Sequence, residues 1–524
     1  MSDEDMFHDY PSRRTSEAER LHLAVHGLAW RDPQLSAAFM LSRRGLLCLT
    51  GVALAIGALG FAVPIAGHSL VLLLLTIPFL CLSTMRLCAL VLLLIPPKRP
   101  RHVKSQHAVR SERMSRAMGR GDHLSAPVLP DHGLPRYAVL VPIYREADSI
   151  PGLVQSLMLL DYPRALLDIV FILEADDHAT QHALARYGLP GFMRTVVVPP
   201  GQPRTKPRAL NYALQGAAGD LVVVYDAEDA PEPDQLKKAV NMFAAGDARL
   251  ACLQARLSIN NRADSWFSRQ FAIEYSVLFG ALLPVLRWLR FPIPLGGTSN
   301  HFRRHVLENV GGWDAFNVTE DADLGLRLAR AGYAVEMLNS TTWEEAPVRW
   351  RVWRGQRRRW LKGWLQTLIV HTREPLRLAS ELGARGTIGF YTLMAGLVLS
   401  ALVHPWVFVL GGMWLAGVDG PGSSSDALTS QLQLEPTAWT WSQWLWAVAI
   451  VNLVLGYASA IGLAWVVCAR DGWRDLCLHC LMMPVYWLLI SAAAYMAIIE
   501  LVRMPHHWEK TVHRARPVTR LPRG

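Results

Sequence analysis

Apolar residues along this 524-residue chain gather in two blocks, near residues 45–95 and 387–502, with the pattern of a globular domain between them. Within the first block, residues 45–66 and 70–95 are each long enough to cross a bilayer as a helix, which takes about 20 residues. The short Gly-His-Ser link at 67–69 predicts that the two runs form a helical hairpin. Both ends of such a hairpin face the same side of the membrane.

The second apolar block contains three runs, at residues 387–417, 441–468 and 477–502. His404 and Pro405 interrupt the first run, and a proline removes a hydrogen bond from the interior of a helix. That run therefore predicts either a kinked span or a tight hairpin. Together with the first block, the pattern predicts five or six transmembrane helices.

Basic residues flank the first apolar block on both sides, as the positive-inside rule describes for cytosolic flanks. They are Arg43, Arg44, Lys98, Arg99, Arg101 and Lys104. Residues 418–440 contain no Lys or Arg, which indicates an extracytoplasmic loop. Because much of the net charge of +10 lies in these flanks, we expect a lipid bilayer rather than nucleic acid as the partner. The pattern predicts a multi-pass protein of the cell inner (plasma) membrane, with its middle region in the cytosol.

Two polar features lie within the apolar blocks. Arg86 falls inside the second predicted span, where a charge is costly and usually faces protein, water or a partner. It predicts either a helix that lines a polar path or a packed, hydrogen-bonded arginine. Cys477 and Cys480 form a C-x-x-C pair, but no second pair accompanies them. We interpret these cysteines as small packing residues rather than as a metal or redox site.

Between residues 136 and 347, short apolar runs alternate with amphipathic helical stretches. The apolar runs lie at 137–141, 169–173, 195–198, 221–225 and 250–253, and two of the helical stretches lie at 149–160 and 206–215. Strands that alternate with helices predict a doubly wound, mostly parallel α/β sheet. Ligands of such sheets bind at the carboxyl ends of the strands, so the residues after each run are candidates for a site.

Acidic residues follow three of the predicted strands. Glu146 follows the first strand, Glu174-Ala175-Asp176-Asp177 the second, and Asp226-Ala227-Glu228-Asp229 the fourth. Clustered carboxylates repel one another unless a cation lies among them, and divalent cations with bound phosphates meet that need. Acidic N-caps of helices are the alternative interpretation. The chain has neither a P-loop nor a G-x-G-x-x-G motif after a strand, which argues against an ATPase and a dinucleotide enzyme.

Six motifs between Val141 and Trp364 resemble, in order, those of the family-two glycosyltransferases of the GT-A fold. The resemblance is in particular to the membrane-bound processive synthases of cellulose, curdlan and hyaluronan. The motifs are Val141-Pro142-Ile143-Tyr144-Arg145-Glu146, Asp176-Asp177, Lys206-Pro207-Arg208-Ala209-Leu210-Asn211, Asp226-Ala227-Glu228, Thr319-Glu320-Asp321 and Gln356-Arg357-Arg358-Arg359-Trp360. The resemblance implies a Rossmann-like α/β GT-A catalytic domain, inserted between transmembrane α-helices.

The resemblance also implies a role for individual motif residues. It assigns nucleotide-sugar binding to Tyr144, Glu146, Asp176, Asp177, Lys206 and Asp226, a bound Mg²⁺ or Mn²⁺ to Asp226 and Glu228, contacts with the acceptor and diphosphate to Gln356, Arg359 and Trp360, and general-base catalysis to Asp321. Arg208 is an alternative to Lys206 as the cation that assists the leaving group. The metal motif is D-x-E here rather than D-x-D, and the first acidic loop reads E-A-D-D rather than D-D-G-S. The second departure leaves open which aspartate meets the base.

Two of these assignments have structural alternatives. Asp321 is also suited to cap the amphipathic helix that it opens. Trp360 belongs to a tryptophan series whose spacing also suits an amphipathic helix on the membrane surface. The series is Trp350, Trp353, Trp360 and Trp364. Residues 265–289 predict a second helix of this kind, and the glycine-rich stretch at 296–301 is a candidate acceptor contact by resemblance.

The chain divides into seven predicted segments. They are a cytosolic N-terminal segment (1–44), a transmembrane hairpin (45–96), a basic linker (97–135), the GT-A domain (136–348), the Q-x-x-R-W motif with interfacial helices (349–386), the C-terminal transmembrane helices (387–502) and a basic cytosolic tail (503–524). The resemblance implies an inverting transferase that polymerises a β-linked polysaccharide and extrudes it through its own helices.

The expected partners are a nucleotide-sugar donor and the growing polysaccharide, and accessory export subunits are compatible with this function. UDP-glucose is the favoured donor, with UDP-N-acetylglucosamine and GDP-mannose as alternatives. A non-processive transferase that adds a sugar to a lipid carrier is the second hypothesis. An inactive scaffold or export subunit is the third, and the complete set of acidic motifs argues against it.

Overall fold

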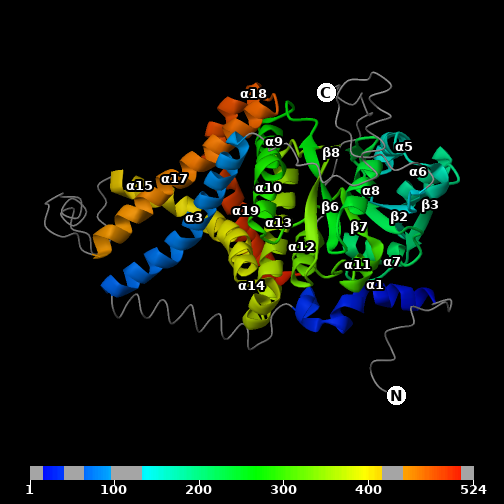
Figure 1. Ribbon diagram of the computed structural model, residues 1–524, viewed down its shortest axis with the longest axis horizontal. Coiled ribbons are helices and arrows are strands. Elements are labelled where there is room, and N and C mark those ends of the chain that lie inside the picture. The colour runs from blue at the N-terminus through cyan, green and yellow to red at the C-terminus, as the bar shows by residue number, and fades with distance from the viewer. Residues whose placement is uncertain (1–15, 40–63, 96–132, 416–440, 509–524) are drawn as a thin grey trace, which may run out of the picture.

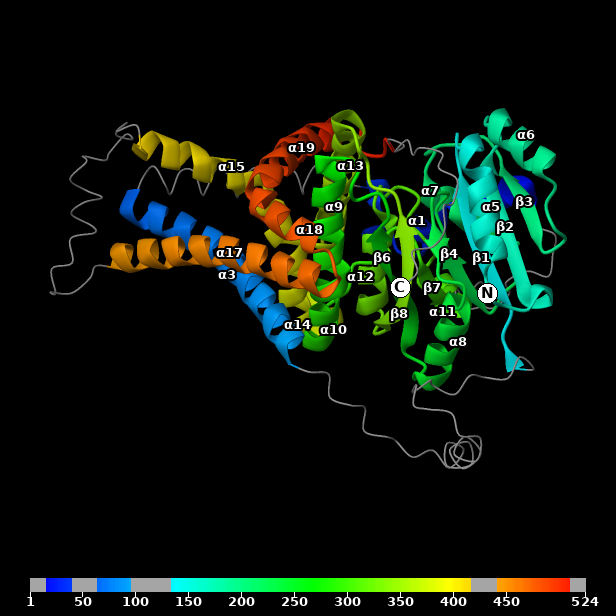
Figure 2. The same cartoon turned by 90° about the horizontal axis from the view of Figure 1, so that it is seen from above.

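The computed structural model describes residues 16–39, 64–95, 133–415 and 441–508. A domain built on one β-sheet occupies one end of the long axis, and helices occupy the other (Figure 1). Seen from above, a further layer of helices lies between the sheet and the outer helices (Figure 2). The predicted α/β domain among apolar helices is therefore confirmed.

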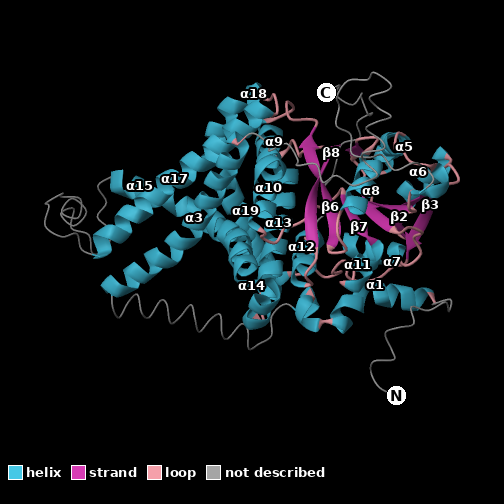
Figure 3. Ribbon diagram, viewed as in Figure 1, coloured by secondary structure: helices cyan, strands magenta, loops and turns pink. Residues whose placement is uncertain are grey.

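The sheet has eight strands in the order β3-β2-β1-β4-β7-β6-β8-β5 (Figure 3). They are β1 (Tyr137–Ile143), β2 (Leu167–Glu174), β3 (Met193–Val198), β4 (Leu221–Val224), β5 (Ala230–Pro231), β6 (Leu250–Ile259), β7 (Asn300–Arg303) and β8 (Ala334–Glu344). The pairings β1–β2, β2–β3, β1–β4 and β6–β8 are parallel, whereas β4–β7, β6–β7 and β5–β8 are antiparallel. The sheet is thus mixed, with the parallel strands that the apolar runs predicted and an antiparallel strand, β7, inserted between β4 and β6.

Helices cover both faces of the sheet. They are α5 (Ile150–Met158), α6 (His178–Tyr187), α7 (Lys206–Leu214), α8 (Gln235–Ala245), α11 (Arg304–Asn309) and α12 (Glu320–Arg330). Successive residues of a strand point to opposite faces. Accordingly Val139 and Val141 of β1 pack in the core beneath α5 and α8, while Ala138 and Leu140 pack in the core beneath α7. The helices predicted at 149–160 and 206–215 are confirmed as α5 and α7.

Three helices form a layer between the sheet and the outer helices (Figure 2). They are α9 (Trp266–Val277), α10 (Leu283–Leu289), which follows α9 through a π-helical turn, and α13 (Trp350–His371). Residues 266–289 are long and apolar enough to cross a membrane, but half of that segment is buried in protein. Trp353 of α13 is fully buried against Phe267 and Tyr486. The tryptophan series of α13 therefore includes packing residues rather than only membrane-surface ones.

The outer helices are long and apolar. They are α3 (Pro64–Leu94), α14 (Pro375–Phe390), α15 (Gly396–Leu415), α17 (Trp441–Arg470), α18 (Arg474–Cys477) and α19 (Met483–Arg503), and a π-helical turn joins α14 to α15. By length and composition, the described residues contain five helices that could cross a membrane, of which residues 266–289 are one. These helices indicate a membrane protein.

Two details of the predicted spans are corrected. Helix α3 runs without a break through residues 67–69, so the hairpin link predicted there is wrong. Most of the predicted span at 45–66 lies outside the described residues. Helix α15 continues through Pro405, which rules out the tight hairpin at that position. Helix α15 packs against α19.

Arg86 lies on α3 where this helix packs against α17. Its guanidinium donates a hydrogen bond to the carbonyl oxygen of Gly456, 3.4 Å away, and the side chain is half-buried. This contact favours the packed arginine over a helix that lines a polar path. Cys477 and Cys480 are free thiols packed near Cys468, as the packing interpretation predicted.

Helix α1 (Glu17–Arg31) has no counterpart among the sequence predictions. It packs against α7 of the sheet domain, along the lower edge of the view in Figure 1. At the other end of the chain, residues 504–508 follow α19 and return to the sheet domain. Segments from both ends of the sequence therefore reach the domain that the sequence placed between residues 136 and 348.

Candidate active site

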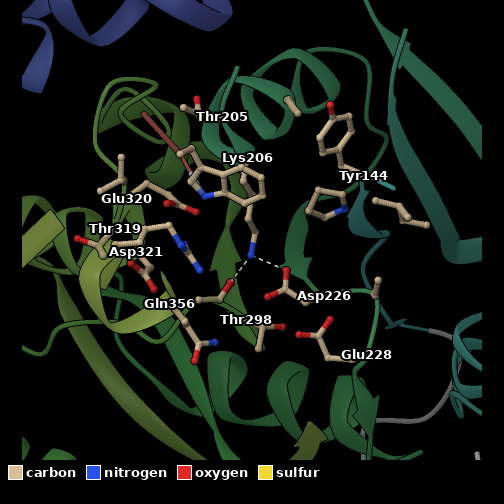
Figure 4. A pocket seen from close by; sticks show the side chains of 18 of the residues that line it. Tyr144, Thr205, Lys206, Asp226, Glu228, Thr298, Thr319, Glu320, Asp321 and Gln356 are labelled. Atoms are coloured by element: carbon tan, nitrogen blue, oxygen red, sulfur yellow. Dashed lines mark hydrogen bonds and ion pairs between the residues drawn. The ribbon is translucent and has the colours of Figure 1, made fainter. Parts of the chain in front are cut away.

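A cavity opens at the carboxyl ends of β1, β2 and β4, between the sheet and α13 (Figure 4). Its walls include residues from five of the six motifs. They are Tyr144, Glu146, Lys206, Asp226, Glu228, Glu320, Asp321, Gln356, Arg359 and Trp360. Strand ends far apart in the sequence meet here because β1, β2 and β4 are adjacent and parallel. The predicted site residues, except Asp176 and Asp177, are thus brought together around one space.

Asp177 has a structural role in the described chain. It is the N-cap of α6, where its Oδ1 accepts a hydrogen bond from the backbone N–H of Thr180 at 3.2 Å. Its Oδ2 accepts from the backbone N–H of Arg145, whose φ of 55° is in the left-handed region. Both carboxylate oxygens are engaged, so the geometry favours the helix-cap interpretation for this residue.

Asp176 lies at the rim of the cavity, where it forms an ion pair with Arg204 at 2.8 Å and accepts a hydrogen bond from the Tyr144 hydroxyl at 3.4 Å. Glu174, at the end of β2, lines the cavity instead. It pairs with the fully buried guanidinium of Arg208. This pairing makes Arg208 part of the protein framework, and of Lys206 and Arg208 only Lys206 lines the cavity.

Lys206 stands at the first position of α7. Its Nζ donates hydrogen bonds to Oδ1 of Asp226 at 2.5 Å and to the carbonyl oxygen of Gly297 at 2.7 Å (Figure 4). Burial by itself lowers the pKa of this lysine, but the carboxylates of Asp226 and Glu320 outweigh burial and raise it above its ordinary value. Lys206 is therefore a fixed positive charge, placed where an anionic ligand would meet it.

Carboxylates accumulate beside Lys206. Asp229 accepts hydrogen bonds at Oδ2 from the backbone N–H of Asp226, at 2.8 Å, and from the Thr298 hydroxyl, while its buried Oδ1 has no hydrogen-bond partner in the described structure. Burial, with the charges of Glu228 and Asp226, raises the pKa of Glu344 to about 8. Burial also raises the pKa of Asp229 well above its ordinary value, so this group of carboxyls resists ionisation, and a bound divalent cation would favour the charged forms.

The donor set fits Mg²⁺ or Mn²⁺ held jointly by protein and ligand. Asp226 and Glu228 both line the cavity and supply the hard oxygen ligands that these ions take. Within the described ranges, no group of three acidic, His or Cys side chains converges as a complete metal site. Mg²⁺ is commonly bound by one or two carboxylates together with substrate phosphates, so two protein ligands are enough for an ion that arrives with a diphosphate.

Asp321 lies in the first turn of α12, whose N-cap position is occupied by Thr319. Its Oδ1 accepts a hydrogen bond from the backbone N–H of Ala322 at 2.8 Å. Its Oδ2 faces Gly297, because a Cβ added at that glycine would lie 3.3 Å from this oxygen. The capping alternative for Asp321 therefore does not hold, and one carboxylate oxygen is left facing the cavity wall formed by residues 296–298.

Burial raises the pKa of Asp321, although the Ala322 N–H, Lys206 and Arg359 act in the opposite direction. Burial and the neighbouring Asp321 charge raise the pKa of Glu320 to about 7. Two adjacent buried carboxyls with raised pKa values are typical of groups that exchange protons in catalysis.

Helix α13 presents alternate faces to the cavity and to the protein core. Gln356, Arg359 and Trp360 line the cavity, and Gln356 Oε1 and Arg359 Nε are buried atoms without a hydrogen-bond partner in the described structure. Arg357 points away from the cavity, forms an ion pair with Glu274 at 2.6 Å and lies over the Phe271 and Trp360 rings. The unpaired polar atoms of the cavity-facing residues are available to a ligand.

Trp508 of the C-terminal tail also lines the cavity, and sequence reasoning missed it. Its ring lies 5.5 Å from the guanidinium carbon of Arg359. The buried Lys362 holds the tail by donating hydrogen bonds to the carbonyl oxygens of Met504 and His507, and it forms an ion pair with Glu500. Its signal in the sequence is the run Pro505-His506-His507-Trp508-Glu509-Lys510-Thr511, which resembles a tail found in bacterial members of the family-two glycosyltransferases.

The mixed α/β sheet and this arrangement of charged groups agree with the GT-A type of glycosyltransferase domain that the motifs imply. Residues 135–363 match the family model described as glycosyltransferase like family 2. The matched region contains the whole sheet and the cavity-facing part of α13. The resemblance to family-two glycosyltransferases is thereby confirmed for this domain.

Several relatives with curated names match part of this chain. The probable glycosyltransferase YdaM of Bacillus subtilis is 30% identical over 237 residues, which cover 44% of this chain and 55% of that protein. A beta-monoglucosyldiacylglycerol synthase of Synechocystis is 30% identical over 247 residues, which cover 46% of this chain and 50% of that protein. A probable glucomannan 4-beta-mannosyltransferase of Arabidopsis thaliana is 25% identical over 242 residues, or 45% of this chain and 43% of that protein. The chain spans about half the length of the curated relatives it matches.

Among solved structures, the mannosyltransferase PcManGT from Pyrobaculum calidifontis, in complex with GDP-Man and Mn²⁺, covers 80% of this chain and 99% of its own. The sequence identity is 19% and the TM-score is 0.43.

Proposed function

We propose that this chain is a membrane-bound, metal-dependent, inverting hexosyltransferase that uses a nucleotide diphosphate sugar. The observation that supports it best is the convergence of Lys206, the Asp226–Glu228 pair and Asp321 on one cavity. The first three groups suit a diphosphate and its cation, and the fourth suits an acceptor hydroxyl. The resemblance to inverting family-two enzymes agrees with this division.

In the proposed reaction, Asp321 accepts the proton of the acceptor hydroxyl while the oxygen attacks the anomeric carbon. The bond from that carbon to the diphosphate breaks as the new bond forms, so an α-linked donor gives a β-linked product. Lys206 compensates negative charge on the departing nucleotide. Asp226 and Glu228 would hold Mg²⁺ or Mn²⁺, which supplies further neutralisation of that charge when bound.

The acceptor side of the cavity consists of Gln356, Arg359 and Trp360. An indole face packs well against the apolar face of a pyranose ring, and the two polar side chains have buried atoms that a sugar hydroxyl or phosphate oxygen would satisfy. This wall supports a sugar acceptor, and hence the polymerisation of a β-linked polysaccharide, with UDP-glucose as the favoured donor. The catalytic domain would then face the cytosol, and the plasma membrane would hold the apolar helices.

Single transfer to a lipid is the second candidate. The relatives named beta-monoglucosyldiacylglycerol synthase support it, because their names specify a glucosylated lipid product. The position of α13 also supports it, since this helix lines the cavity and packs on α19 of the apolar bundle. The wall of the cavity is therefore continuous, through α13, with the apolar helices that a lipid acceptor would adjoin.

The test is turnover of labelled nucleotide-sugars by the purified chain in lipid nanodiscs with Mg²⁺ or Mn²⁺. Asp321→Asn is the inactive variant, and Asp247→Asn, an exposed carboxylate outside the cavity, is the matched control. High-molecular-weight product that appears with wild type and Asp247→Asn but not with Asp321→Asn supports polymerisation. Label in a lipid-soluble product alone supports the second candidate, and no turnover of any donor contradicts both.

A metal titration tests the cation separately. Chelation by EDTA should abolish turnover, and Mn²⁺ or Mg²⁺ should restore it. Glu228→Gln removes one charged ligand, so we expect at least a tenfold higher metal concentration for half-maximal rate, which corresponds to about 1.4 kcal/mol. A variant with unchanged metal dependence would exclude Glu228 as a ligand.

A further inference from the structure

Helix α1 is attached to α7, the helix that begins with Lys206. A capping box formed by Ser16 and Glu19 starts α1, and its inner face is buried. Asn211 of α7 donates a hydrogen bond from Nδ2 to the carbonyl oxygen of Ala24 at 3.0 Å, and Gln215 donates to the carbonyl oxygen of Arg20 at 2.9 Å. These hydrogen bonds to backbone carbonyls of α1 fix both the position of α1 along α7 and the distance between the two helices.

Asn211 also joins α7 to the loop that leads to Asp321. Its Nδ2 donates to the carbonyl oxygen of Trp313 at 2.6 Å, and its Oδ1 accepts from the Trp313 N–H at 3.0 Å. The loop approaches closely because Gly311 and Gly312 have φ values of +85° and +66°. A Cβ at Gly312 would lie 2.5 Å from Asn211 Oδ1, and one at Gly311 would lie 2.9 Å from Leu28 of α1.

The chain after α1 holds the same loop at a second point. Asp314 is 1% exposed, and its carboxylate accepts hydrogen bonds from the Ser36 hydroxyl at 3.1 Å, the Ala37 N–H at 2.5 Å and the Phe316 N–H at 3.1 Å. Two of these three donors belong to the N-terminal segment. A buried carboxylate that loses its hydrogen bonds is costly, so the loop keeps this position only while residues 36 and 37 are in place.

The segment is finally tied to α13 and α14. Arg373 donates hydrogen bonds to the carbonyl oxygens of Pro33, Gln34, Ser36 and Phe39. Asp32 forms an ion pair with Arg377 at 2.6 Å. Residues 16–39 therefore connect the helix of Lys206, the loop before Asp321 and the end of the helix that carries Gln356 and Arg359.

We propose that residues 16–39 act as an N-terminal brace that positions Asp321 relative to α7 in the transferase site. The roles of Lys206 and Asp321 in this inference rest on the proposed function. None of the brace residues lines the cavity, so their effect passes through Asn211 and Asp314, which are positioning residues. The brace acts on alignment of the base rather than on contacts with the donor.

Loosening the brace should therefore lower kcat and leave the KM for the donor nearly unchanged. Misplacement of a catalytic group by about 1 Å can cost about 100-fold in rate. For Asp314→Ala we expect kcat to fall about 10- to 100-fold, with donor KM within about threefold of wild type. Ser36→Ala removes one of the three hydrogen-bond donors to Asp314 and should lower kcat by less than about tenfold. The kcat of Asp314→Asn should lie between those of Asp314→Ala and Ser36→Ala.

Asp168→Ala is the matched control, because Asp168 also accepts hydrogen bonds from a side chain and a backbone N–H but lies at the amino end of β2. Hydrogen exchange of residues 313–320 is measured beside kcat, KM and melting temperature. If the brace holds the loop, Asp314→Ala and Ser36→Ala should both show faster hydrogen exchange at residues 313–320 and a lower kcat. Asp168→Ala should leave both the kcat and the exchange of residues 313–320 unchanged.

Equal losses of kcat in Asp314→Ala and Asp168→Ala, in proportion to their melting temperatures, would overturn the proposal. Unchanged exchange of residues 313–320 in both brace variants would overturn it as well. If wild type turns over no donor, the proposed function fails, whereas the exchange measurement still decides whether the brace holds the loop. Ser36→Ala keeps the comparison valid if Asp314→Ala does not fold.

Discussion

Glu320 and Asp321 are neighbours in the first turn of α12, and the ionisation of one disfavours that of the other. Burial raises both pKa values, that of Glu320 to about 7. Because the proposed base works only when ionised, kcat/KM should rise with pH and reach a plateau, with its acidic limb above the ordinary range of an aspartate. A pH–rate profile at saturating metal measures this limb, which belongs to the pair rather than to one residue.

Glu320→Gln should move that limb to lower pH. The substitution removes the Glu320 titration, whose pKa of about 7 lies well above the ordinary value, and leaves only the Asp321 titration, which burial raises. The measurement is the same profile for the variant, with Asp247→Asn as the control that should not shift. A limb that stays in place or moves to higher pH would show that Glu320 does not set the protonation of the base.

Trp508 provides a second prediction at the scale of a single residue. Its ring lies on the cavity beside Arg359, so Trp508→Ala should raise the acceptor KM about tenfold, equivalent to about 1.4 kcal/mol of lost contact. Trp508→Phe keeps an aromatic face and should recover most of the loss. Trp288→Ala, at an exposed tryptophan of α10, is the control. Equal effects of the Trp508 and Trp288 substitutions would contradict a role in the site.

The positions of several motif residues follow from the elements that carry them. Lys206, Asp226 and Asp321 reach the cavity because each follows or opens a regular element, and Trp360 reaches it from the middle of α13. Glu344 was not predicted as a site residue. It joins the carboxylates beside Lys206 from the end of β8, a strand in which buried and half-buried residues do not alternate regularly. Asp177 was predicted to bind the nucleotide-sugar, but it caps α6. An aspartate that precedes a helix suits a cap and a ligand-binding residue equally well, so the sequence alone does not separate the two.

At the scale of elements, a buried ion pair joins α13 to α19. Lys362 is fully buried and lies 2.7 Å from Glu500, which Arg358 also contacts at 2.6 Å. Lys362→Met leaves a carboxylate with less compensation, and breaking a buried pair typically costs about 3–5 kcal/mol. We expect a correspondingly lower melting temperature in detergent, and weaker attachment of residues 504–508.

An exposed pair is the control for this prediction. Lys238→Met breaks a surface contact with Glu232, and surface pairs contribute about 0–1 kcal/mol. If the two methionine variants melt at the same temperature, the Lys362 pair contributes no more than a surface contact.

Which elements the sequence could predict follows from their local physics. Strands β1, β2 and β4 are continuous apolar runs buried on both faces and were found, whereas β5 has two residues and β7 reads Asn-His-Phe-Arg. Residues 266–289 have an apolar content that suits a membrane span and a buried helix alike. Only the packing of α9 on β6 and α17 distinguishes the two.

At the scale of the whole molecule, the sheet domain and the outermost helices lie at opposite ends (Figure 1). The charge pattern predicts that this axis crosses the membrane, with the sheet domain in the cytosol. In spheroplasts of a cysteine-free variant, an impermeant maleimide should label a cysteine introduced at Ser424 in intact cells. A cysteine at Ser105 should react only after lysis, and labelling of both positions from the same side would contradict the predicted topology.

Phe316 lies between the two ends of the described chain, with its ring 5.7 Å from that of His26 and 5.3 Å from that of His506. Segments made early and late in translation thus meet at the loop that precedes Asp321. A nascent chain still lacks Trp508 and its anchor on α19 when the sheet domain has already emerged from the ribosome. The cavity is therefore complete only after α19 has been synthesised and has docked, so assembly of the site depends on assembly of the apolar helices.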